Sequence, residues 1–218
     1  MQLVAYGAQD IYLTGNPQIT FFKVVYRRHT NFSMETIQQT INGTPAASGS
    51  STVTISRNGD LVYKVYVNND STSLTNGTEL VNEVELEIGG QRIDRQYAEL
   101  NDIWNELSIP HHKAAAFRTM AHVGHGVEAT AGSVITSEHG QLTQIPLNFW
   151  FCRNPGLALP LIALQYHEVK LKFTWGSTVK CGGGQASAQV WCDYIYLDTD
   201  ERRRFAQVSH EYLIEQLQ

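Results

Sequence analysis

The chain has 218 residues, of which 42% are hydrophobic and 17% are charged, and its formal net charge is −5. This composition is typical of a folded globular protein and excludes an intrinsically disordered chain. The acidic balance also argues against direct nucleic-acid binding, because the two basic clusters, at 27–29 and 202–204, are short and acidic residues precede the second one.

The length allows one large β domain or two small ones, and the abundant Gly, Tyr, Thr and Val favour strands and turns. Cys152, Cys181 and Cys192 form an odd set without a C-x-x-C motif, which indicates plain thiols made in a reducing compartment. We expect no signal peptide after Met1, and no apolar run reaches the ~18 residues of a membrane span.

The first 31 residues differ from the rest of the chain. A turn at Gly15-Asn16-Pro17 precedes an apolar run over 19–26, which ends in a basic cluster. One interpretation is an edge strand of the main sheet. The other is an arm that docks on a partner, since an apolar terminus would otherwise promote aggregation.

Alternating apolar side chains begin at Met34 and continue past a small-residue loop at 45–50. Residues 52–56 and 61–67 both alternate with period two, and Asn58-Gly59 between them is a strong hairpin-turn dipeptide. We therefore predict a β-hairpin over residues 52–67.

The next strand places Val84, Leu86 and Ile88 on one face and three glutamates on the other. The glutamate row, Glu83, Glu85 and Glu87, could hold a cation, but nothing completes a ligand shell, so we predict a solvated strand face. Gly89-Gly90 turns the chain.

Residues 97–107 change to a helical period. Leu100, Ile103, Trp104 and Leu107 follow the i, i+3, i+4, i+7 spacing, which predicts a short amphipathic helix stopped by Pro110. Over 110–141 we expect a helix only at 114–120, and several glycines indicate an extended loop region.

The segment 145–175 joins two strand-like runs through an apolar link pinned by Pro155 and Pro160. In the second run every other residue from His167 to Trp175 points one way, which predicts a strand against the core. The link is so apolar that it should lie against something.

Residues 177–187 contain three consecutive glycines and are predicted to be a flexible loop. The last strand, 189–197, is apolar on both faces, as expected for a strand covered on both sides. Residues 198–218 are polar by comparison.

Two groups of residues could carry a function other than architecture. The first is a histidine-rich set that could bind a metal as in cupins: His111, His112, His122, His125, Glu128 and His139. Because a cupin uses a His-x-His pair on a strand, whereas these residues fall in a glycine-rich loop, solvated histidines are the simpler interpretation. The second comprises the aromatic residues near 63–66 and 194–196, which could stack on sugars in a carbohydrate-binding module. We assign no catalytic, cofactor or metal residue, and the sequence has no G-x-S-x-G, H-E-x-x-H, Walker or Rossmann pattern.

Five blocks in order along the chain resemble the major capsid proteins of nucleocytoplasmic large DNA viruses, of phycodnavirus and mimivirus type. They are Gly7 to Phe32, Ile55 to Val62, Val84 to Asp94, Asn154 to Leu171 and Asp193 to Gln218. The stretches that do not obviously match, about 105–142 and 176–188, are predicted loops.

The resemblance implies an all-β fold, an antiparallel eight-stranded jelly-roll sandwich with a short helix and long loops, and two such jelly rolls in the full protein. This chain ends where the first would finish, so we expect a fragment or a short paralogue. The implied domains are an N-terminal arm at the capsomer base (1–31), jelly-roll domain 1 (32–200) and a linker toward a second jelly roll (201–218).

The resemblance also implies a function. We expect a structural component and not an enzyme. It should form homotrimers, each of which is a pseudo-hexagonal capsomer, and the capsomers should tile an icosahedral virion shell. Expected partners are other copies, neighbouring capsomers and minor capsid proteins bound through residues 1–31, with an internal membrane nearby and assembly in the host cytoplasm. The loops 68–78 and 105–142 are candidates for the outward crown and for contacts between subunits.

Overall fold

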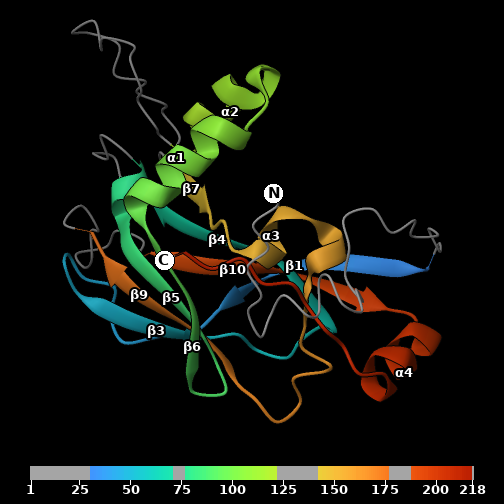
Figure 1. Cartoon of the computed structure of the whole chain (residues 1–218). Coiled ribbons are helices and arrows are strands. Elements are labelled where there is room, and N and C mark those ends of the chain that lie inside the picture. Colours follow the sequence, from blue (N-terminus) through green and yellow to red (C-terminus); the bar gives the residue numbers. More distant parts are fainter. Residues whose placement is uncertain (1–29, 71–76, 122–141, 177–187, 218) are drawn as a thin grey trace, which may run out of the picture.

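Two antiparallel sheets form the body of the protein in a computed structural model that describes residues 30–70, 77–121, 142–176 and 188–217 (Figure 1). Sheet A has the order β1-β10-β4-β7, with β8 also paired to β4, and sheet B has the order β2-β3-β9-β5-β6. The strands of sheet A are β1 (Phe32–Gln39), β4 (Leu61–Asp70), β7 (Leu142–Pro146), β8 (Leu159–Pro160) and β10 (Gln189–Leu197). The strands of sheet B are β2 (Ile41–Asn42), β3 (Ser50–Thr54), β5 (Val81–Ile88), β6 (Gln91–Tyr97) and β9 (Val169–Trp175).

The strand order is that of a jelly roll. Apart from the two-residue strands β2 and β8, the sheets have the orders β1-β10-β4-β7 and β3-β9-β5-β6. Most connections cross from one sheet to the other, so that strands adjacent in sequence rarely pair, as in double-sheet Greek-key folds. The predicted eight-stranded antiparallel sandwich is confirmed.

Four α-helices and two short 3₁₀ turns complete the described residues. The helices are α1 (Ala98–Ser108), α2 (His111–Ala121), α3 (Trp150–Arg153) and α4 (Thr199–Gln207), and the 3₁₀ turns are η2 (Gly77–Leu80) and η3 (Pro155–Leu157). Figure 1 places α1 and α2 together at one end of the sandwich, away from α4. The helices predicted near 97–107 and 114–120 are both confirmed, although the second begins at His111.

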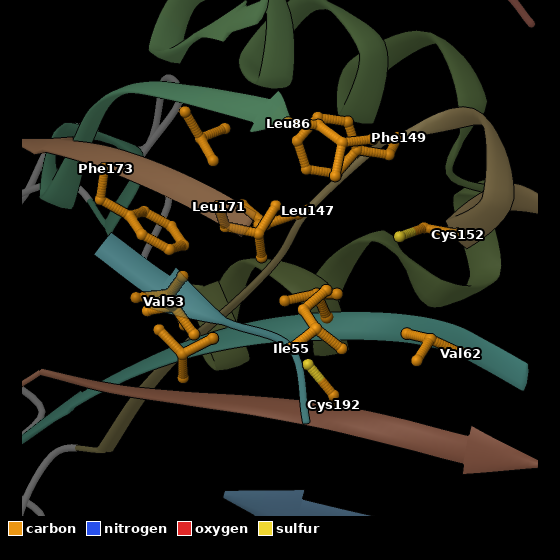
Figure 2. Close-up of a cluster of buried hydrophobic side chains, with 14 of the residues drawn as sticks. Val53, Ile55, Val62, Leu86, Leu147, Phe149, Cys152, Leu171, Phe173 and Cys192 are labelled. Atoms are coloured by element: carbon orange, nitrogen blue, oxygen red, sulfur yellow. The ribbon is translucent and has the colours of Figure 1, made fainter. Parts of the chain in front are cut away.

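The core lies between the sheets and is built from alternate residues of their strands. Val84 and Leu86 of β5 are fully buried, and so are Leu171 and Phe173 of β9, which are at most 1% exposed. Figure 2 shows side chains from both sheets gathered in this space. The Trp175 indole is buried in the same cluster and donates a 2.7 Å hydrogen bond to the Ser51 hydroxyl, so its polar atom is satisfied. The predicted inward row of β5 and the predicted buried face of 169–175 are confirmed.

The hairpin predicted over residues 52–67 is wrong. β3 pairs with β2 and β9 in sheet B, whereas β4 pairs with β10, β7 and β8 in sheet A. Gly59 does not adopt a positive φ, which the tight hairpin turn would require. Its missing side chain serves a close approach instead, because a Cβ there would lie 2.8 Å from that of Tyr194.

The corner between the two sheets is held by hydrogen bonds from distant residues. The Tyr194 hydroxyl donates to the Ser56 carbonyl at 2.6 Å, and the Arg57 guanidinium donates to the carbonyls of Leu164 and His167. These long-range contacts direct the chain from one sheet to the other, and they outweigh the local preference of Asn58-Gly59 for a hairpin turn. The true tight turn is Gly89-Gly90 between β5 and β6, where both glycines have positive φ, as predicted for a turn.

The segment 145–175 departs from prediction at its start. Its first strand, β7, ends at Pro146, and the next residues form α3 instead of continuing a strand. The apolar link does lie against the core, since Phe149, Phe151 and Leu161 are at most 2% exposed. In the second run His167 is exposed and the buried alternation begins at Val169.

The last strand is covered on both sides over part of its length. Cys192 and Tyr194 belong to the central core, whereas Ile195 packs in a second cluster with Leu61 and Ala158 against the partly buried Phe205 of α4. Asp198 precedes α4 and accepts the Thr199 backbone N–H, and acidic residues in the first turn favour this helix start.

The domain boundaries at 31/32 and 200/201 stay predictions. Only the last two residues of segment 1–31 are among the described ones, and α4 runs through the second boundary.

Candidate interaction surfaces

The histidine-rich set that could bind a metal lies largely outside the described residues. His122, His125, Glu128 and His139 lie in the segment 122–141, and Cys181 lies in 177–187. His111 and His112 begin α2 and are exposed. Within the described ranges, no group of three His, Cys, Asp or Glu side chains is placed to hold a metal ion.

The two described cysteines are unreactive core residues. Cys152 and Cys192 are buried and form no disulfide. Burial raises the pKa of the Cys152 thiol to about 12 and also raises the pKa of Cys192, so neither is a thiolate at neutral pH.

The tyrosines considered for sugar stacking are fully or partly buried in the sheets. Tyr194 is fully buried and donates to the Ser56 carbonyl, so its ring faces no ligand. Tyr63, Tyr66 and Tyr196 are partly buried, and desolvation is the largest cause of the raised pKa of Tyr66.

The outer face of sheet B carries rows of opposite charge. Glu85 pairs with Arg92 at 3.3 Å and with Arg95 at 2.8 Å, Glu83 pairs with Arg95 at 2.7 Å, and Glu87 pairs with Lys172. The three glutamate side chains are only 14–20% exposed. The prediction of a solvated row is therefore corrected, because basic residues of the two neighbouring strands, β6 and β9, pair with the carboxylates.

The pKa of Glu85 reflects these partners. Burial raises it, but the hydrogen bonds and charges of Arg92 and Arg95 outweigh that effect and lower the pKa below its usual value of 4.5. Glu85 therefore stays ionised, and the face offers neutralised charge where a cation site would need free carboxylates.

The outer face of sheet A carries an apolar cluster. Leu61, Ala158 and Ile195 form its buried cluster, under Phe205 of α4. Phe32 and Met34 of β1 pair with Leu197 and Ile195, which places them on the same face, and they remain 64% and 49% exposed. The edge of this face is thus an uncovered apolar patch.

Helix α1 turns polar residues toward the sandwich. Asn101 and Asn105 are buried, and each side-chain oxygen accepts a hydrogen bond from the Asn148 amide, at 3.1 and 3.0 Å. Two members of the apolar stripe, Ile103 and Leu107, are consequently 59% and 80% exposed. The helical spacing exists as predicted, but Ile103 and Leu107 face the solvent, whereas Leu100 and Trp104 are partly buried.

The exposed face of α1 is also acidic. Glu99 and Glu106 lie on the same side as Ile103 and Leu107, because positions three, four, seven and eight apart share a helix face. We call these four residues the acidic ridge.

A groove of about 650 Å³ lies on the other side of α1, between this helix and α2. Its apolar lining includes Trp104, Phe117 and Met120, and Lys64 and Lys113 lie at the same groove. We call these five residues the basic groove. Helix α2 supplies Lys113 and Arg118 and has no acidic residue.

Arg153 joins α1 to the last described residues. Its guanidinium carbon lies 3.7 Å from the centre of the Trp104 ring, its Nε donates to the Asn148 carbonyl, and it pairs with Glu215. Nearby, the Leu217 backbone N–H donates to Asp94. The segment after α4 is therefore attached to the sandwich.

Sequence reasoning missed both Asn148 and Arg153. The pair Asn101 and Asn105, four residues apart on one helix face, was a signal that this face is polar. Arg153 gave no signal of its own, since its partners are distant in sequence.

None of the helices in the described ranges has the length and apolar character needed to cross a membrane.

Comparison with known proteins gives concordant matches. Residues 20–198 match the family model described as the major capsid protein N-terminus. The chain is 56% identical to the major capsid protein of Pyramimonas orientalis virus and 48% identical to that of Paramecium bursaria Chlorella virus 1. Both alignments cover 100% of this chain, but only 58% and 52% of the relatives, so the chain spans about half of their length.

Solved structures agree. The quasi-atomic model of the PBCV-1 virus capsid matches with a TM-score of 0.71 and 44% identity, over 91% of this chain and 50% of that one.

Proposed function

Because the chain belongs to the major capsid protein N-terminus family, we propose that it is a structural, non-catalytic subunit of a virus capsid. The observation that carries this proposal is its structural match, at 44% identity and a TM-score of 0.71, to a protein of the PBCV-1 capsid. Its localisation would be the virion, after assembly in the host cytoplasm.

The proposed mechanism is self-association. Three copies would form a pseudo-hexagonal capsomer, and capsomers would tile an icosahedral shell. The sandwich supports this role because its tightly packed core makes a rigid unit, while apolar and charged surfaces remain at its exterior. No step of such an assembly needs a catalytic group.

The proposed division of labour follows the three segments. Residues 32–200 would form the wall unit, 1–31 an arm at the capsomer base that binds minor capsid proteins near the internal membrane, and 201–218 a link to a second jelly roll. The supporting observation for the link is that the relatives are about twice as long as this chain.

Sedimentation velocity of the purified chain tests self-association. We expect oligomers or a polydisperse distribution, because exposed apolar surfaces such as Phe32 and Leu107 are left uncovered. A monodisperse monomer at high micromolar concentration would contradict the proposal.

A carbohydrate-binding module is the competing function for a jelly roll. Burial of Tyr194 removes one of its candidate stacking residues. Screening the chain on a glycan array separates the two functions, and specific glycan binding by a monomeric chain would favour the module.

A further inference from the structure

We propose that the acidic ridge of one copy binds the basic groove of a neighbouring copy, so that successive copies join head to tail. The inference deepens the proposed function and rests on it, since it names the surfaces through which the chain self-associates. It starts from two features left unexplained by the sandwich itself, an exposed apolar helix face and an unfilled groove beside it.

The acidic ridge has the composition of an interface helix. Ile103 and Leu107 expose most of their side chains to water, whereas the asparagines on the opposite face of α1 are buried. Glu99 and Glu106 flank them, and α1 contains no basic residue. An apolar pair bordered by carboxylates suits a partner that offers an apolar surface bordered by cations.

The basic groove has the complementary composition. Phe117 and Met120 supply its apolar lining together with Trp104, against whose ring the Arg153 guanidinium lies. Lys64 lies 5.2 Å from the Tyr63 ring, and among the described residues neither Lys64 nor Lys113 is within ion-pair distance of a carboxylate. These two lysines could therefore form ion pairs with carboxylates that a partner brings to the groove.

The existing contacts of the ridge leave it available. Glu106 lies 3.8 Å from Arg118 in the same molecule, and the two side chains are 65% and 42% exposed. A long ion pair between exposed groups is weak and readily exchanged.

A second copy is the occupant that the observations favour, because one chain carries both halves of the fit. Within one molecule the ridge cannot enter the groove, since Trp104 of the groove and Ile103 of the ridge are consecutive residues of one helix. When the copy that receives the ridge does not return its own ridge to the same neighbour, the contact is heterologous, and such contacts close into rings when the rotation between copies allows it. The proposed trimer is the smallest such ring.

Complementation of two variants tests the pairing. The ridge variant carries Ile103→Asp and Leu107→Asp. The groove variant carries Lys113→Glu and a second change, Ala116→Glu, at a residue that also lines the groove. All four positions are exposed. Each variant alone should self-associate on the order of tenfold more weakly than the unaltered chain, or worse. An equimolar mixture should form heterodimers, because the intact ridge of one variant can bind the intact groove of the other. It should form no ring, because each variant keeps only one of the two patches.

Sedimentation velocity distinguishes the outcomes. If the unaltered chain oligomerises and each variant alone oligomerises equally well, the inference is overturned, but the proposed function still stands. A mixture that stays monomeric also overturns the inference. An unaltered chain that is monomeric throughout the concentration range refutes self-association itself.

Photocrosslinking keeps the inference testable if a variant misfolds. Leu107 is replaced by p-benzoyl-phenylalanine in the otherwise unaltered chain, and isotopically mixed copies identify crosslinks between molecules. We expect crosslinks to residues 113–120 of another copy, and crosslinks confined to other surfaces would overturn the proposal. The same replacement at Tyr166 is the matched control and should give none to 113–120. Tyr166 is 93% exposed and lies at a pocket with Phe205 of α4, a helix that Figure 1 shows away from α1 and α2.

Discussion

The outer faces of the two sheets differ in character: one is charged and the other carries an apolar cluster. Sheet B faces outward with rows of glutamate, arginine and lysine that pair across β5, β6 and β9. Sheet A faces outward with an apolar cluster, which the chain covers itself through Ala158 and through Phe205 of α4. The cover stops short of β1, where Phe32 and Met34 are exposed.

The difference shows how stability is distributed over the molecule. Burial of apolar area contributes about 25 cal/mol per Å², whereas exposed ion pairs contribute about 1 kcal/mol or less. The free energy of unfolding should therefore be sensitive to changes on the outer face of sheet A and tolerant of changes on that of sheet B. Four substitutions, in order of falling effect, test this contrast.

Ile195→Ala should cause the largest loss. The side chain is 7% exposed beneath the cover of sheet A, and its truncation leaves a cavity, so we expect a loss of about 2–4 kcal/mol in the free energy of unfolding. Urea denaturation measures it. Thr52→Ala, on the outer face of sheet B, is the matched control and should cost about 1 kcal/mol or less. Equal losses at the two sites would remove the contrast.

Asp60→Ala should detach the cover from sheet A. The carboxylate is 8% exposed and accepts the Leu197 backbone N–H at 2.8 Å and the Arg202 guanidinium at 3.0 Å. Leaving a buried N–H without a partner costs about 1–3 kcal/mol, measurable by urea denaturation. Arg202→Ala keeps the backbone hydrogen bond and should cost clearly less. If the two losses are equal, the ion pair and not the buried hydrogen bond secures α4.

Glu85→Gln probes the charged face and has a pH signature. We expect a loss of about 1 kcal/mol or less at neutral pH, because the Arg92 and Arg95 partners are 59% and 39% exposed and solvent screens the pairs. The pKa of Glu85 is lowered in the folded state, so its contribution is present above the usual value of 4.5 and disappears as the pH falls through the lower folded value.

The difference in unfolding free energy between the unaltered chain and Glu85→Gln should accordingly shrink on acidification below about pH 4.5. Urea titrations from pH 7 to pH 3 measure it. Glu211→Gln, at an exposed position outside the charged face of sheet B, is the control substitution. A difference that grows toward acid pH would contradict the assignment.

Phe32→Ser should have the smallest effect on stability. The side chain is 64% exposed at the uncovered edge of sheet A, so the free energy of unfolding should change by about 0.5 kcal/mol or less. Aggregation, followed by light scattering, should fall because the apolar patch shrinks. Tyr166→Ser, at an aromatic residue that is 93% exposed outside this patch, should leave aggregation unchanged. A large stability loss at Phe32 would show that the edge is covered after all.

Local patterns predicted the elements of this fold well. The period-two rows of β5 and β9 and the helical spacing of α1 are properties of contiguous residues, and each corresponds to an observed element. The Gly89-Gly90 turn was predictable for the same reason, because it depends on the backbone freedom of two adjacent glycines.

The failures share a cause. Asn58-Gly59 favours a hairpin locally, but Tyr194, more than a hundred residues away, fills the space beside Gly59 and donates to the Ser56 carbonyl. Similarly, the helix period of α1 was visible, yet Asn148 decides which face turns inward by pairing with Asn101 and Asn105.

The sequence by itself therefore determined the period of β5, β9 and α1, the β class and, through its resemblance to capsid proteins, the sandwich. Only the tertiary structure decided which sheet β3 and β4 each join, that the glutamates of β5 are paired with basic residues, and that α1 shows Ile103 and Leu107 to the solvent. The physical reason is range: periodicity arises from neighbouring residues of one strand or helix, whereas pairing and orientation depend on contacts between residues that meet only when the chain has folded.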